Sequence, residues 1–165
     1  MAIIKLNNQS ISAVSALPAA IATGKVLQVV SARYGTIKTS TSSTWSDIGL
    51  TASITPSNAS NKILVFGNIA GLSKTNGSNT YMGLRLLRGD SEIHLLATQS
   101  GFTDSTARDS MGGDGLTYLD SPNTTSSTTY KFQFRNTPAT GTVTVNDGSS
   151  LNGSTITLME IVIWL

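Results

Sequence analysis

The sequence contains one histidine, His94, and no cysteine, and these two facts limit its possible chemistry. Without cysteine, disulfides, thiolate zinc sites and cysteine nucleophiles are excluded. A single histidine cannot assemble the usual transition-metal sites. A Ser–His–Asp triad is not indicated either, because the sequence has no Gly-x-Ser-x-Gly elbow. We therefore expect His94 to be an ordinary strand residue, and we expect no metal, no cofactor and no enzymatic activity.

Four aspartates lie in or beside a polar segment that we expect to be a loop over residues 98–114. They are Asp104, Asp109, Asp114 and Asp120. Oxygen-rich loops can hold calcium, although the spacing of an EF-hand is absent. Aspartate next to glycine is also ordinary turn chemistry. The sequence alone leaves calcium binding open here.

Glu160 is the one charged residue in a strongly apolar segment near the end of the chain. Strict alternation places its side chain on the same face as Ile156 and Leu158, the face expected to be buried. A buried carboxylate needs a cationic partner or a shifted pKa. We expect an ion pair with Arg85 or Arg135, and the alternative is exposure through a β-bulge.

The composition favours an all-β protein. Of 165 residues, 39% are hydrophobic and only 12% are charged, and the remaining polarity comes largely from Ser, Thr, Asn and Gly. These residues suit strands and turns. The net charge of +2 comes from scattered Lys and Arg, so nucleic-acid binding is not indicated. No apolar stretch approaches the roughly 20 residues that span a bilayer, so membrane insertion is not expected.

Apolar alternation and turn residues predict about nine strands from residue 25 onward. A hairpin is expected around Arg88–Ser91, where the Arg-Gly-Asp tripeptide is more simply a turn than an integrin-binding motif. In the segment Thr129–Arg135, alternation points Tyr130, Phe132 and Phe134 inward. Strands at this spacing indicate an antiparallel β-sandwich of jelly-roll type over residues 25–165.

The last strand is apolar on both faces, which means that both faces must be covered. One face is expected to pack in the chain's own sandwich, and the other against a neighbouring copy in a cyclic homotrimer. The predicted trimer interface consists of Met159, Ile161, Ile163, Trp164 and Leu165.

Residues 1–24 differ from the rest of the chain and are expected to form an N-terminal arm. The arm is apolar enough to need a partner, but Asn7, Asn8 and Pro18 interrupt it, so it cannot build its own core. We expect it to dock on another protein or on its own or a sister head. The predicted docking residues are Ile3, Ile4, Leu6, Ile11, Val14 and Leu17.

Several segments resemble virion proteins of tailed bacteriophages, notably those of marine and cyanobacterial phages. The similar stretches are residues 2–9, Trp45–Pro56, Leu116–Pro122 and Thr155–Ile161. In that family, compact β heads occur in tail-fibre-like and head-decoration proteins, many of them trimeric. The resemblance implies a component of the outer virion surface, made in the host cytoplasm.

Two roles remain within that class. A short arm leading into one head, without a long shaft, favours a head-decoration (cement) protein bound to the major capsid protein. The alternative is a short tail-fibre or fibre-tip protein that binds a host surface glycan. Exposed aromatic rings would favour the glycan role, and the candidates are Tyr34, Trp45, Tyr81 and Phe102.

Overall fold

A computed structural model describes residues 24–75, 79–103, 109–138, 140–148 and 153–162. These residues form ten β-strands and no helix. The strands are β1 Lys25–Tyr34, β2 Lys38–Ser40, β3 Ser46–Ile54, β4 Lys62–Thr75, β5 Thr80–Arg88, β6 Ser91–Thr103, β7 Asp109–Asp120, β8 Thr128–Thr137, β9 Thr142–Val145 and β10 Ser154–Val162. No helix in this part of the chain could cross a membrane.

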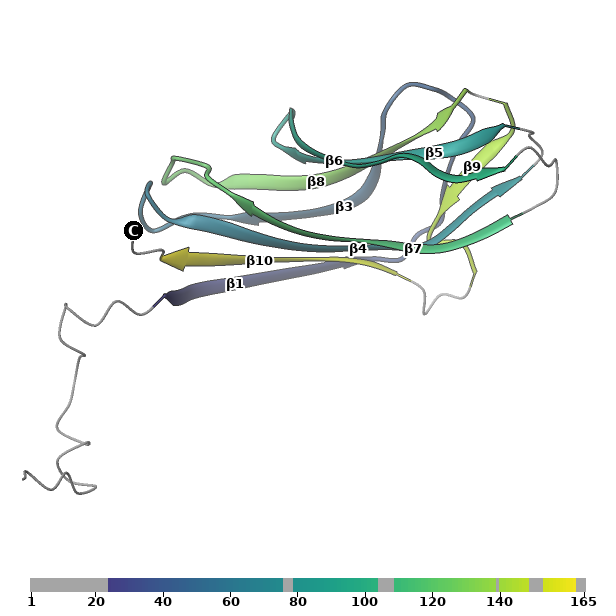
Figure 1. Ribbon diagram of the computed structural model, residues 1–165. Helices are drawn as coiled ribbons and strands as arrows, with labels where there is room; N and C mark the ends of the chain where they lie inside the picture. Colours follow the sequence, from purple (N-terminus) through teal and green to yellow (C-terminus); the bar gives the residue numbers. More distant parts are fainter. Residues whose placement is uncertain (1–23, 76–78, 104–108, 139, 149–152, 163–165) are drawn as a thin grey trace, which may run out of the picture.

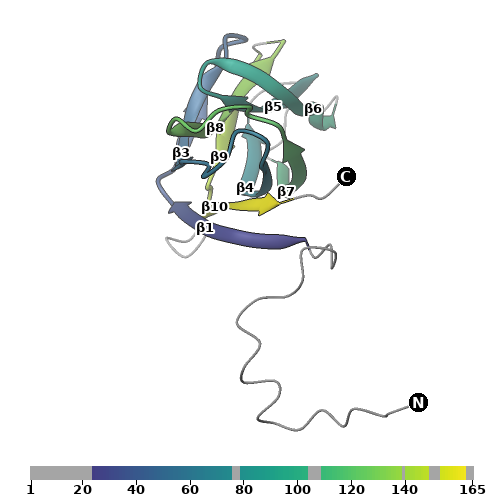
Figure 2. The ribbon, with the colours of Figure 1, turned by 90° about the vertical axis from the view of Figure 1, so that its left-hand side faces the viewer.

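The strands form two antiparallel sheets packed face to face, which confirms the predicted sandwich of jelly-roll type (Figures 1 and 2). Sheet A has the order β1-β10-β4-β9-β2, and β7 pairs with the other side of β4. Sheet B has the order β3-β8-β5-β6. β4 is therefore central, as its nearly continuous apolar sequence predicted, and β1 forms an edge of sheet A.

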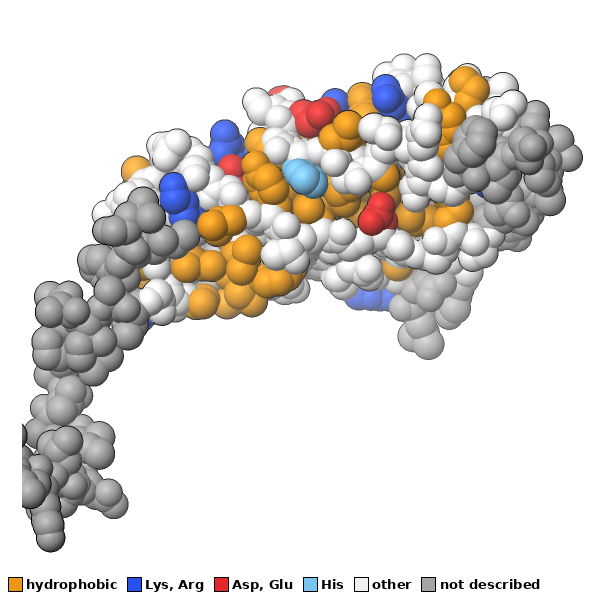
Figure 3. Space-filling model, viewed as in Figure 1, with side chains coloured by type: hydrophobic (Ala, Val, Ile, Leu, Met, Phe, Trp, Pro, Cys, Tyr) orange, Lys and Arg blue, Asp and Glu red, His pale blue; other side chains and the backbone are white. Residues whose placement is uncertain are grey.

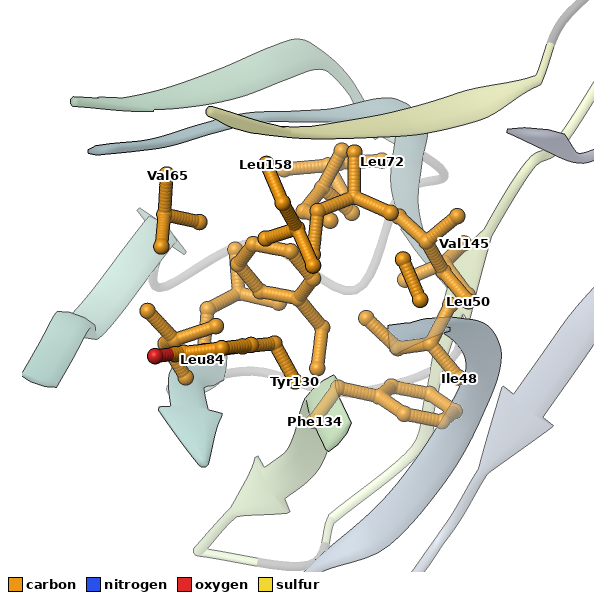
Figure 4. Close-up of a cluster of buried hydrophobic side chains, with 14 of the residues drawn as sticks. Ile48, Leu50, Val65, Leu72, Leu84, Tyr130, Phe134, Val145 and Leu158 are labelled. Carbon is orange, nitrogen blue, oxygen red and sulfur yellow. The ribbon is translucent and has the colours of Figure 1, made fainter. Parts of the chain in front are cut away.

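The core lies between the sheets and is filled by side chains that alternate inward along each strand. Figure 4 shows part of this cluster, with side chains of both sheets directed at one another. β8 is the clearest case, because Tyr130, Phe132 and Phe134 are buried as predicted while the residues between them are partly exposed.

Local turn chemistry also matches the sequence where the signal is strong. β5 and β6 form the predicted hairpin, with Arg88 opposite Ser91 and Gly89 at a positive φ of 59°. A left-handed backbone of this kind is the reason for a glycine in the turn.

The predicted loop over residues 98–114 is wrong. β6 continues to Thr103, and β7 already begins at Asp109. β7 is polar and rich in glycine, and its pairing with β4 contains register shifts between Ile69 and Ser73. Leu116 and Tyr118 in its second part pack against the core, whereas backbone hydrogen bonds to the long β4 strand hold its polar first part in the sheet.

The strand count of about nine was one short because β2 has only three residues and lies in a Ser/Thr-rich segment. β1 begins at Lys25, where the predicted head begins. The predicted docking residues of the arm, from Ile3 to Leu17, lie outside the described residues.

Candidate assembly surface

One row of apolar side chains crosses four strands on the outer face of sheet A. The register places Val29 of β1 opposite Met159 of β10, Met159 opposite Leu64 of β4, and Leu64 opposite Leu119 of β7. The neighbours of Met159 and Leu64 along their strands, Leu158 and Val65, are fully buried in the core. Because successive side chains in a strand point to opposite faces, the row itself faces outward.

Further apolar side chains extend this row on both sides. At the two ends of the row itself, Val29 is 55% exposed and Leu119 is 47% exposed, although both side chains are hydrophobic. We call the whole set the apolar surface: Val26, Leu27, Val29, Leu64, Phe66, Leu119, Met159 and Ile161. In Figure 3, hydrophobic side chains gather on the lower left of the molecule, over this end of sheet A. Contiguous apolar surface of this kind is typical of an interaction site.

The apolar surface lies where the described chain begins and where it ends. Lys25 at the start of β1 is opposite Val162 at the end of β10. The first and last strands of the described chain therefore have these two ends side by side at the margin of this surface (Figure 2). A partner that covered the surface would lie next to both chain ends.

The structure places only part of the predicted trimer interface. Met159 and Ile161 lie on the outer face of β10 and are partly exposed, whereas Ile163, Trp164 and Leu165 lie outside the described residues. The contributions of β1, β4 and β7 to this surface were not predicted from the sequence. Leu64 and Phe66 could have been found, because they alternate with the buried Val65.

Glu160 lies beneath this end of the sheet, and its side chain is fully buried. One carboxylate oxygen accepts hydrogen bonds from the Asn61 amide at 2.5 Å and from the backbone N–H and hydroxyl of Ser57, both at 2.7 Å. The other oxygen accepts a hydrogen bond from Gln28 Nε2 at 2.6 Å. Burial raises the pKa of this carboxyl, but the hydrogen bonds from Asn61, Gln28 and Ser57 outweigh burial and lower the pKa to about 2.

The predicted ion pair of Glu160 is therefore wrong, and so is the alternative of exposure. Neutral donors, rather than Arg85 or Arg135, satisfy the carboxylate. The register of β10 with β4 is continuous through Glu160, so no bulge turns the side chain outward. The contacts join the β3–β4 loop to β1 and β10, and this fixes the backbone beneath the apolar surface.

Arg85 and Arg135 lie instead on the outer face of sheet B. Their guanidinium groups cover the Trp45 ring, at 4.4 Å and 4.5 Å from its centroid. Arg85 also forms an ion pair with Glu92 at 2.9 Å and binds the Gln133 side chain. The outer face of sheet B is thus charged where the outer face of sheet A is apolar.

The aromatic residues named as glycan-binding candidates are placed as follows. Trp45 is covered by two guanidinium groups, and the Tyr34 ring packs against the backbone of Gly49, where an added Cβ would lie 2.5 Å from the ring. Tyr81 is only partly exposed, and the Phe102 side chain lies outside the described residues.

The remaining candidates for chemistry, His94 and Asp120, have packing or hydrogen-bond partners in the described part of the chain. The His94 ring lies 5.1 Å from the Tyr118 ring and is partly buried. Asp120 accepts hydrogen bonds from Arg88 at 2.9 Å and from the Tyr130 hydroxyl at 2.6 Å. Burial raises the pKa of Tyr130 well above its ordinary value, and the Asp120 contact raises it further. Among the described residues, no three His, Cys, Asp or Glu side chains could hold a metal ion together.

No family model matches the chain, and no curated protein matches it in sequence. Among solved structures, VP2 of the subviral particle of infectious bursal disease virus has a TM-score of 0.47 and 11% identity over 81% of this chain. VP2 of the Gx strain of that virus has a TM-score of 0.42 and 12% identity over 81% of this chain. The aligned region is 36% of each VP2 chain. This similarity is too distant to assign a function.

Proposed function

We propose that this protein is a non-catalytic structural component of a bacteriophage virion. In this proposal it is a head-decoration (cement) protein that sits on the capsid surface as a homotrimer. The observation that carries the proposal is the apolar surface on the outer face of sheet A. The resemblance of several segments to virion proteins of tailed phages supplies the biological setting.

The apolar surface favours assembly because water is a poor solvent for it. Removing apolar surface from water contributes about 25 cal/mol per Å², and a stable interface buries about 800 Å² per partner. Val29, Met159, Leu64 and Leu119 already form a row across four strands. In a closed trimer, part of this surface would contact a neighbouring copy, and the remainder would face the capsid.

The opposite face of the sandwich is suited to solvent. Arg85 pairs with Glu92, and Lys131 lies 3.2 Å from Asp90 and 3.9 Å from Asp47. A sandwich with one apolar and one charged outer face supports attachment to a shell by the first face and exposure of the second. The N-terminal arm, which leaves beside the apolar surface, is the proposed docking segment.

The proposal is tested by locating the chain in the particle. Gold-labelled antibody against the head should bind along the shell of the phage that encodes the chain. Labelling confined to the tail tip would favour the fibre alternative over decoration. Absence of the chain from purified particles would contradict a virion role altogether.

A further inference from the structure

A second feature of the outer face of sheet A is a groove of about 350 Å³ beside the apolar surface. Two rows of paired residues form it. In one row Thr157 is opposite Phe66, and Phe66 is opposite Thr117; in the next row Thr155 is opposite Asn68, and Asn68 is opposite Gly115. Gly115 has no side chain, and an added Cβ there would meet only the Gly67 carbonyl oxygen, at 3.9 Å. The missing side chain leaves the hollow.

The lining of this groove combines one open aromatic ring with unused hydrogen-bonding groups. Phe66 is 39% exposed. The side chains of Asn68, Thr117 and Thr155 make no hydrogen bond within the described part of the chain, whereas the Thr157 hydroxyl contacts Ser31 at 3.2 Å. No charged side chain lines the groove. Its chemistry is that of an amide and hydroxyl groups around an apolar ring.

The exposed ring of Phe66, together with the amide and hydroxyl groups around it, indicates which class of ligand the groove can bind. A wholly apolar ligand would leave the amide and the hydroxyl groups without partners, which is costly. An anion would find no cation in the lining. A neutral, hydroxylated ring with an apolar face can stack on Phe66 and exchange hydrogen bonds with Asn68 and the threonines, because amides and hydroxyls both donate and accept. The volume also lies within the range of small-molecule sites.

We propose that this groove binds a neutral sugar unit, with its ring against Phe66 and its hydroxyl groups toward Asn68, Thr117 and Thr155. Phe66 was not among the aromatic residues that the sequence singled out, because its exposure depends on the small neighbours across the sheet. A single head carries the complete groove. The groove shares Phe66 with the apolar surface, so the inference requires that the proposed trimer and capsid contacts leave this margin of the surface open.

The proposal is tested by saturation-transfer NMR on the full-length chain. The probes are methyl β-galactopyranoside, methyl α-glucopyranoside and N-acetylglucosamine, each at a concentration on the order of 10 mM, because a single sugar ring binds weakly. At least one probe should receive saturation. Gly115→Val should reduce its binding at least tenfold by filling the hollow, and it should fold normally because β-branched residues suit strands.

A matched pair of substitutions provides the control. Thr117→Val removes a hydroxyl from the groove, while Thr51→Val makes the same change on an exposed position of β3 in sheet B. Binding should weaken only in the first. Failure of all three probes to bind, or equal binding by the wild type and Gly115→Val, would overturn the proposal.

Discussion

At the scale of single residues, Glu160 links stability to pH. Its carboxyl has a pKa of about 2 in the folded chain, against an ordinary value of 4.5. A carboxyl whose pKa is lowered by folding stabilises the folded state above the unfolded pKa, and this stabilisation is lost as the pH falls toward the folded pKa. The difference corresponds to about 3 kcal/mol of unfolding free energy.

We therefore predict that the urea-unfolding free energy is constant near neutral pH and falls between pH 4.5 and about 2. Glu160→Gln should be less stable than the wild type at neutral pH by about 2 kcal/mol, because its amide nitrogen would replace one of the two acceptor oxygens and face the donor of either Asn61 or Gln28. The variant should also lose less stability in acid than the wild type does. An unchanged acid dependence in the variant would contradict this role of Glu160.

A substitution of His94 tests whether this protein has an enzymatic activity that uses its histidine. Its ring contacts Tyr118 rather than a nucleophile or a cluster of metal ligands. We predict that His94→Ala changes the unfolding free energy by only about 1 kcal/mol, through lost ring packing. Particle assembly and infectivity should be unchanged. Loss of a hydrolytic activity in this variant would refute the non-enzyme proposal.

At the scale of strands, two glycines on neighbouring strands of sheet A have opposite roles. A Cβ on Gly67 of β4 would lie 2.4 Å from the Phe132 ring of sheet B, whereas a Cβ on Gly115 of β7 would meet only the Gly67 carbonyl oxygen, at an ordinary contact distance of 3.9 Å. Gly67 thus allows the two sheets to approach each other. Gly115 instead leaves the groove open.

This contrast predicts different costs for the same substitution. Gly67→Ala should lower the unfolding free energy by about 1–3 kcal/mol through overpacking. Gly115→Ala should stay within about 0.5 kcal/mol of the wild type. Thermal and urea unfolding of the two variants measure both values. An equal loss of unfolding free energy in the two variants would mean that the Phe132 ring moves aside. The distance between the two sheets would then not depend on Gly67.

The sequence predicted a strand well where buried apolar side chains stabilise it, and poorly where backbone pairing with a distant strand does. β8 was predicted residue by residue, because burial of Tyr130, Phe132 and Phe134 imposes a visible period of two. β7 was predicted only over Leu116–Leu119, because its polar first part is held by backbone pairing with β4 and shows no apolar alternation. The same limit applies to the Glu160 site, whose donors Gln28, Ser57 and Asn61 lie far away in the sequence.

At the scale of the whole molecule, the apolar surface depends on strand order. Val29, Leu64 and Leu119 come from three separate segments, and only the order β1-β10-β4-β7 brings them into one row with Met159. The sequence identified Met159 and Ile161 because the last strand is apolar on both faces. It could not identify their neighbours, since pairing between distant strands is not encoded in local alternation.

Self-association should therefore depend on this surface rather than on the last strand alone. Light scattering of the purified chain should give three times the chain mass of 17.2 kDa. Val29→Lys should reduce this mass, because it places a charge at the β1 end of the row. Ile37→Lys, at a site that is 50% exposed outside the apolar surface, is the matched control and should leave the mass unchanged. A wild-type chain that stays monomeric at micromolar concentration would refute the trimer.

Salt separates apolar association from association by charge. At about 1 M salt the Debye length falls to roughly 3 Å, so exposed ion pairs weaken, whereas apolar burial does not depend on them. The only charge within the rows of the apolar surface comes from Lys62, opposite Ile161. We predict that the trimer, and the binding of the protein to particles, both survive molar salt. Sedimentation of particles in low and high salt measures the second quantity, and release of the protein by salt alone would show that charged contacts, rather than the apolar surface, hold it there.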